Sequence, residues 1–142
     1  MKAARFYKAN EPLKIEDVPQ PKPGPGEVLI AVKAAGLCGT DLHIAVEGTI
    51  PTAVQPITLG HEAAGVIAEV GAGVLEWKVG DRVAVFPNIA CGECYACVSG
   101  REALCLKSRI LGVQADGAFA EYLLVPARTL VRLADPISFD VG

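Results

Sequence analysis

A cluster of four cysteines constrains this chain more strongly than any other feature of its sequence. The four are separated by gaps of two, two and seven residues, and they are Cys91, Cys94, Cys97 and Cys105. Two-residue gaps let successive thiolates turn around one point, and the longer arm supplies a fourth donor. The spacing is typical of a structural zinc site, which is tetrahedral and leaves no open position for a substrate.

Disulfides and an iron–sulfur cluster are the alternative uses of these cysteines. The chain starts with Met1-Lys2-Ala3-Ala4-Arg5 and shows no apolar core or cleavage site of an export signal. We therefore expect a reducing, cytoplasmic location, where disulfides are rare. The gaps also differ from those of the usual ferredoxin runs, so zinc is the favoured occupant.

Length and composition predict a single domain, residues 1–142, that is large enough to bury a core. Apolar residues make up 51% of the chain and the mean hydropathy is +0.38, but no apolar run approaches the roughly 18 residues of a membrane helix. The formal net charge is −3 and no cluster of Lys and Arg is present. Nucleic acids and anionic membranes are therefore not expected as partners.

Short apolar and β-branched runs between turn residues predict a mainly β fold. The runs cover residues 28–32, 65–70, 82–86, 119–125 and 130–133, and residues 3–7 and 13–17 predict an opening hairpin. Only residues 39–44 suggest a short helix. Fifteen glycines and ten prolines punctuate the strands, which favours a barrel or sandwich over a parallel sheet.

A second group of candidate metal ligands consists of Cys38, His61 and Glu62. Cys38 is the only cysteine outside the cluster, and His61 is one of two histidines. A thiolate and an imidazole form a good partial set for zinc, and a catalytic zinc has three protein ligands and one open position. Glu62 adjoins His61, so it is either an alternate ligand or a supporting carboxylate. Taken alone, Cys38 also fits a small buried apolar residue.

Three residues near Cys38 suit supporting roles at such a site. Asp41 could accept the second N–H of a metal-bound imidazole, which fixes the tautomer of the ring. The hydroxyl of Thr40 could pass a substrate proton onward, and His43 could release it to solvent. The ordinary alternatives are a helix cap formed by Thr40 and Asp41 and a surface position for His43.

Several motifs together resemble those of zinc-containing medium-chain alcohol dehydrogenases. Residues 60–65 read Gly-His-Glu-Ala-Ala-Gly, and residues 79–83 read Val-Gly-Asp-Arg-Val ahead of the cysteine cluster. Residues 38–41, Cys-Gly-Thr-Asp, resemble the first catalytic-zinc segment of that family. Residues 117–122, Gly-Ala-Phe-Ala-Glu-Tyr, resemble the strand after its cysteine lobe. The resemblance covers essentially the whole chain, in order.

This resemblance implies a GroES-like, partly open β-barrel with short helices and a four-cysteine zinc lobe. It implies oxidation of a small-molecule alcohol or reduction of a carbonyl, with NAD(P) as the hydride carrier. Cys38 and His61 would bind the catalytic zinc, with Glu62 as the neighbouring carboxylate. The second cysteine ligand of some members is absent here. Relatives of the sorbitol and threonine dehydrogenase type use a carboxylate instead, but this third ligand lies beyond the barrel.

The resemblance also implies roles for the supporting residues. Asp41 would be the partner of His61, Thr40 would accept the alcohol proton, and His43 would end the proton relay. The four clustered cysteines would hold the structural zinc.

No Gly-x-Gly-x-x-Gly motif follows a strand in this chain. We therefore expect a catalytic domain without its nucleotide-binding domain, inactive alone and prone to self-association through exposed apolar faces. One alternative is a zinc-stabilised, non-catalytic binding module whose second site is vestigial. A zinc-free quinone or enoyl reductase domain is disfavoured, because it explains neither Cys38 with His61 nor the cysteine cluster.

Overall fold

The computed structural model describes all residues, 1–142, and every paired strand in it is antiparallel. The strands are β1 (Lys2–Phe6), β2 (Lys14–Asp17), β3 (Glu27–Gly36), β4 (Ile57–Thr58), β5 (Glu62–Val70), β6 (Arg82–Val85), β7 (Asn88–Ile89), β8 (Arg109–Ile110), β9 (Tyr122–Pro126) and β10 (Leu130–Arg132). The helical segments are α1 (Gly39–Leu42), a π-helical turn (His43–Glu47), α2 (Tyr95–Val98) and two 3-10 turns (Glu102–Leu104 and Ala127–Thr129). None of these helices combines the length and apolar content that crossing a bilayer requires.

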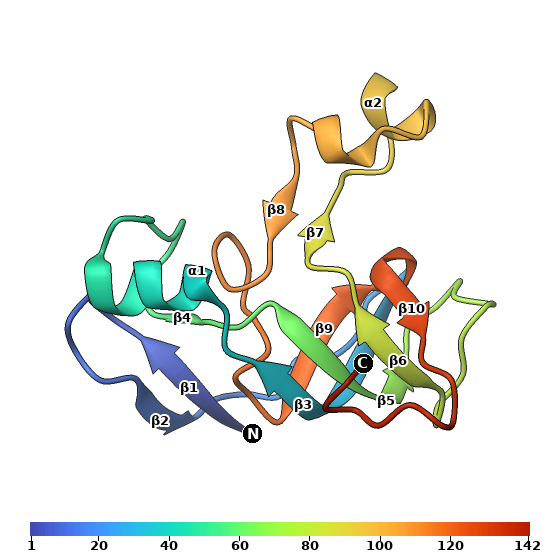
Figure 1. Cartoon of the computed structure of the whole chain (residues 1–142). Helices are drawn as coiled ribbons and strands as arrows, with labels where there is room; N and C mark the ends of the chain where they lie inside the picture. Colours follow the sequence, from blue (N-terminus) through green and yellow to red (C-terminus); the bar gives the residue numbers. More distant parts are fainter.

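A five-stranded sheet in the order β10-β6-β5-β3-β9 forms the main body of the fold (Figure 1). Strand β3 is its longest element and pairs with β5 on one side and β9 on the other. A core cluster of 13 buried residues packs on this sheet, and Val28, Ile30, Val83 and Val125 are among its most buried members. The mainly β architecture expected from the sequence is confirmed.

A second, smaller sheet in the order β2-β1-β4 lies beside α1 (Figure 1). Its core cluster consists of the buried residues Phe6, Ile44, Ile57, Leu59 and Val113. Because Ile44 belongs to the turn that follows α1, this cluster fixes the segment after Cys38 against β4. An isolated bridge between Ala3 and Ala120 connects the small sheet to the segment before β9.

The cysteine-bearing segment forms a lobe that projects away from both sheets (Figure 1). Its base is the two-stranded pair of β7 and β8, and its outer part contains α2 and a 3-10 turn. The lobe has only a small core, made of Ala90, Cys97 and Cys105. A segment with so little buried apolar surface needs another source of order, and a metal is the usual one in small motifs.

The turn before β6 explains the residues of the Val-Gly-Asp-Arg-Val motif. The buried carboxylate of Asp81 accepts a hydrogen bond from Lys78 Nζ at 2.5 Å and from the Lys78 amide at 3.2 Å. Arg82 donates to the carbonyl oxygens of Asp135 and Ile137, and its guanidinium lies 4.5 Å from the ring centroid of Phe139. Asp81 thus closes the turn, and Arg82 holds the C-terminal segment against β6.

The strands predicted from the sequence correspond to β3, β5, β6, β9 and β10, and the opening hairpin to β1 and β2. The structure extends β3 to Gly36 and begins β5 at Glu62, so both strands reach the candidate site. The predicted helix is α1, continued by a π-helical turn. Six elements were not predicted: β4, β7, β8, α2 and the two 3-10 turns. Each has two to four residues, too few for a periodic pattern.

Asp81 makes the stability of the fold sensitive to acid. The hydrogen bond from Lys78 holds the pKa of Asp81 below its ordinary value of 3.8. As the pH falls through this range, the unfolded chain takes up the proton first, so the contribution of Asp81 to stability is lost. We expect Asp81→Asn to lower the free energy of unfolding at neutral pH, and the difference from wild type to shrink below about pH 4. Urea unfolding at several pH values measures this.

Asp140→Asn is the matched control, because Asp140 is exposed. If the difference in free energy of unfolding between wild type and Asp81→Asn stays constant from neutral pH to pH 3, the Asp81 carboxylate is not the source of the acid sensitivity.

Candidate metal centres

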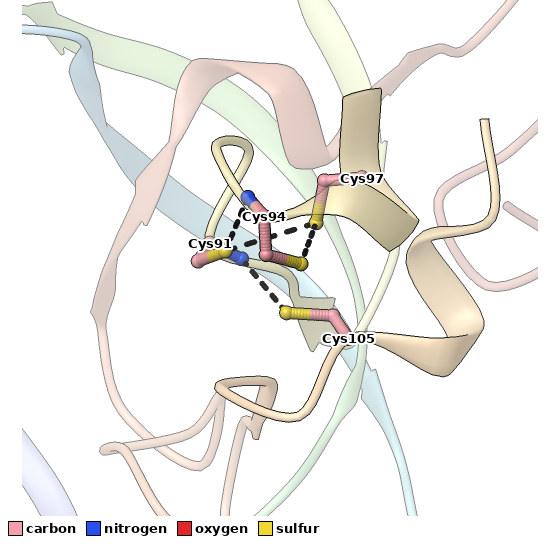
Figure 2. Close-up of side chains that lie close together, drawn as sticks. All are labelled: Cys91, Cys94, Cys97 and Cys105. Atoms are coloured by element: carbon pink, nitrogen blue, oxygen red, sulfur yellow. Dashed lines mark hydrogen bonds between the residues drawn. The ribbon is translucent and has the colours of Figure 1, made fainter. Parts of the chain in front are cut away.

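The four lobe cysteines point toward one another (Figure 2). Their sulfur atoms all lie within 4.8 Å of one another, and all five cysteines of the chain are free thiols. Sulfur–sulfur distances are 3.8 Å for Cys91–Cys97 and 3.5 Å for Cys94–Cys97. Zinc–sulfur bonds of about 2.3 Å in a tetrahedron require sulfur–sulfur edges of about 3.8 Å. The predicted cysteine cluster is therefore present, with a size that fits a four-thiolate zinc site.

Backbone amides and burial shift the pKa values of these thiols in opposite directions. Hydrogen bonds from the amides of Glu93 and Cys94 lower the pKa of Cys91 to about 6. Burial raises the pKa of Cys97 to about 12. The amide of Cys91 also donates to the sulfur of Cys105 at 3.4 Å. The amides of the loop thus stabilise the thiolate form of Cys91. A thiolate at the buried Cys97 needs a nearby cation for stabilisation.

The lobe is tied to the barrel by a side chain that sequence reasoning missed. Arg128 donates a hydrogen bond to the carbonyl of Ala90, directly before the first cysteine. Within the lobe, Lys107 Nζ and Glu93 Oε1 form an ion pair at 2.9 Å. Because Arg128 lies 38 residues from Ala90 in the chain, no local pattern could have identified this contact.

The structure also brings Cys38, His61 and Glu62 together. One ligand atom from each lies within 4.8 Å of the other two. Cys38 is the N-cap of α1, while Glu62 is the first residue of β5 and His61 directly precedes it. His61 Nδ1 is buried and has no hydrogen-bond partner. A thiolate, an imidazole and a carboxylate at this separation form a three-ligand set suited to zinc.

Asp41 joins the two segments that carry these ligands. Its side chain is 2% exposed. Its Oδ2 accepts the amide of Cys38 at 3.0 Å, and its Oδ1 accepts the amide of Gly60 at 3.1 Å. His61 Nδ1 lies 3.8 Å from Asp41 Oδ1, which is longer than a hydrogen bond. Asp41 is therefore placed beside His61, as predicted, but its hydrogen bonds go to the backbone.

The predicted proton-relay residues lie on α1 and the turn after it. The Cys38 sulfur is 3.8 Å from Thr40 Oγ1, which places the hydroxyl beside a candidate ligand. His43 is half exposed, and its Nδ1 lies 2.7 Å from Glu47 Oε2. Sequence reasoning missed Glu47, although its position four residues after His43 on a helical segment is a recognisable pairing signal.

Comparisons with known proteins agree with this geometry. Residues 24–135 match the model of the alcohol dehydrogenase GroES-like domain family. The chain belongs to this family. It is 46% identical to an L-threonine 3-dehydrogenase of Streptomyces avermitilis, across 100% of this chain and 42% of that protein.

Two solved structures of alcohol dehydrogenases likewise match nearly the whole chain with less than half of their own length. An alcohol dehydrogenase of Escherichia coli CFT073, complexed with NADH, matches 98% of the chain and 40% of its own, with 41% identity and a TM-score of 0.88. A cobalt- and zinc-bound alcohol dehydrogenase of Pyrobaculum aerophilum matches 93% of the chain and 41% of its own, with 39% identity and a TM-score of 0.85.

The family resemblance predicted from the sequence is therefore confirmed. The domain spans about 42% of the length of the curated relatives that it matches. Its metal ligands and relay residues stay predictions, and both clusters have geometries that fit zinc.

Proposed function

We propose that this chain is the zinc-binding catalytic domain of an NAD(P)-dependent alcohol dehydrogenase of the sorbitol and threonine dehydrogenase type. Its reaction would be oxidation of a small-molecule alcohol, or reduction of a carbonyl, by hydride transfer. The observation that carries the proposal is the convergence of Cys38, His61 and Glu62 within 4.8 Å. The free thiol state of all five cysteines fits the reducing, cytoplasmic location expected from the sequence.

The donor set defines how the site would work. Cys38 and His61 would hold a zinc ion, with the carboxylate of Glu62 as the third protein donor. Because Nδ1 of His61 faces Asp41, the opposite ring nitrogen is the one available for metal. When bound there, zinc supplies a Lewis acid that lowers the pKa of an alcohol hydroxyl and so favours loss of hydride to NAD(P).

Residues of α1 and the following turn would manage the proton. The hydroxyl of Thr40, next to the Cys38 sulfur, would accept the proton of the alcohol. His43 is exposed and bonded to Glu47, so it is placed to deliver a proton to solvent. The lobe cysteines, Cys91, Cys94, Cys97 and Cys105, would hold a second zinc ion with a purely structural role.

Zinc content tests the proposal directly. We expect the chain, prepared without chelators, to contain two zinc ions. Cys38→Ser and Cys97→Ser should each reduce this number to one, because each removes a ligand from a different cluster. Elemental analysis per folded chain measures the number. A value of one in both wild type and Cys38→Ser would instead support a zinc-stabilised binding module without a catalytic metal.

Hydride transfer needs a bound nicotinamide cofactor, and the chain contains no nucleotide-binding motif of its own. We therefore propose that residues 1–142 form one domain that works with a nucleotide-binding domain outside these residues. The pure chain with two zinc ions, mixed with alcohols and NAD or NADP, should form no reduced cofactor above the rate without protein. Formation of NADH or NADPH that is lost in Cys38→Ser would refute this part of the proposal.

Apolar side chains near the second metal centre suggest how this surface is used. Leu37, Leu42 and Val46 are 68%, 47% and 54% exposed. Exposed apolar groups of this kind mark surfaces that contact a partner, which a nucleotide-binding domain or, in a binding module, another protein would supply. Without that partner, we propose that the chain associates with itself.

Light scattering over a range of protein concentrations tests this. We expect the average mass to rise with concentration in wild type and to rise less in Leu37→Ser/Val46→Ser. The exposed pair Leu75→Ser/Val79→Ser, in the segment between β5 and β6 and at the opposite end of β5 from Glu62, is the control. A wild-type mass that stays monomeric at every concentration would contradict the proposal.

A further inference from the structure

Gly36 faces the candidate ligand Glu62 across two paired strands. It is the last residue of β3, Glu62 is the first residue of β5, and the two are direct partners in the strand register. A Cβ atom added at Gly36 would lie 2.3 Å from Glu62 Oε2 and 3.1 Å from Glu62 Cβ. The Glu62 carboxylate therefore occupies the space that any other residue at position 36 would fill.

The backbone does not account for glycine at this position. Eight glycines of the chain have a positive φ, and Gly36 is not among them. An alanine could therefore adopt the same backbone conformation. The space taken up by the carboxylate is the one observed feature that requires the side chain to be missing.

We propose that Gly36 is a positioning residue that admits the carboxylate of Glu62 to the Cys38–His61 site. This rests on the proposed function, because it concerns the third donor of that metal site. The absence of a Cβ at position 36 lets Glu62 fold back over the end of β3, where its oxygen reaches within 4.8 Å of the other two ligand atoms. Glycine at 36 thereby makes a carboxylate available where a second cysteine is lacking.

The surroundings indicate what a methyl group at position 36 would do. Glu62 also lines a cavity of about 240 Å³, together with Ala34, Phe139 and Asp140. The atom that meets the added Cβ most closely is the end of a flexible side chain. We therefore expect a methyl group to displace the carboxylate from its place beside Cys38, while the strands need to shift by only a few tenths of an ångström.

Cobalt binding followed by its thiolate absorption tests the proposal in the full chain. Each spectrum is compared with that of Cys38→Ser, which keeps the lobe cysteines, so the difference reports only the Cys38 site. We expect Gly36→Ala to weaken cobalt binding at this site by about 10- to 100-fold, the usual effect of losing an orienting group. Glu62→Ala should weaken it to a similar extent.

A double-mutant cycle separates positioning from a general effect on folding. In Gly36→Ala/Glu62→Ala, the carboxylate that the methyl group displaces is already gone, so cobalt should bind as in Glu62→Ala alone. Gly24→Ala is the matched control, because a Cβ there meets only the carboxylate oxygen Oε2 of Glu27, at 3.2 Å, which is not a candidate ligand, and it should bind cobalt as wild type does. Thermal unfolding of every variant confirms that the barrel is intact.

Failure of the Gly36 proposal and failure of the proposed function give different cobalt-binding results. Wild-type affinity in Gly36→Ala, or losses that add in the double variant, would overturn the role of Gly36 while leaving the metal site in place. A wild-type chain without any Cys38-dependent cobalt signal would overturn the proposed function and this proposal with it.

Discussion

The buried carboxylate of Asp41 is the interaction on which the second metal centre depends. It accepts the amide of Cys38 at 3.0 Å and the amide of Gly60 at 3.1 Å, and it is 2% exposed. Burying a carboxylate without partners costs on the order of several kcal/mol, so both amides must stay in place. Because one amide belongs to a candidate ligand and the other directly precedes His61, a single side chain aligns the two segments before any metal binds.

The pairing of β3 with β5 supplies the rest of this alignment, and it explains why small residues follow Glu62. Ala63 and Ala64 are buried, and a Cβ at Gly65 would lie 2.3 Å from the carbonyl oxygen of Ala31. The strands therefore approach too closely for larger side chains at this point. The motif of residues 60–65 combines two candidate ligands, His61 and Glu62, with the packing that brings them to the end of β3.

The sequence was most informative where the relevant contacts are local. The cysteine spacing predicted the lobe cluster because all four donors lie in one short loop. The hairpin and the five main strands followed from short apolar and β-branched runs between turn residues. The contact of Arg128 with Ala90 and the register of Gly36 opposite Glu62 join residues far apart in the chain. Such contacts depend on the finished sheet, so the pattern of any one segment contains no signal for them.

A metal would therefore be coupled to folding in different ways at the two candidate centres. The lobe has a core of only three buried residues, two of them cysteines, so a metal would replace the apolar core that this segment lacks. The second centre lies at the ends of two strands of the main sheet and is fixed by Asp41. Loss of a metal from the lobe would therefore remove the main interaction that orders residues 91–105. Loss of a metal from the second candidate centre would leave its strands and the Asp41 contacts in place.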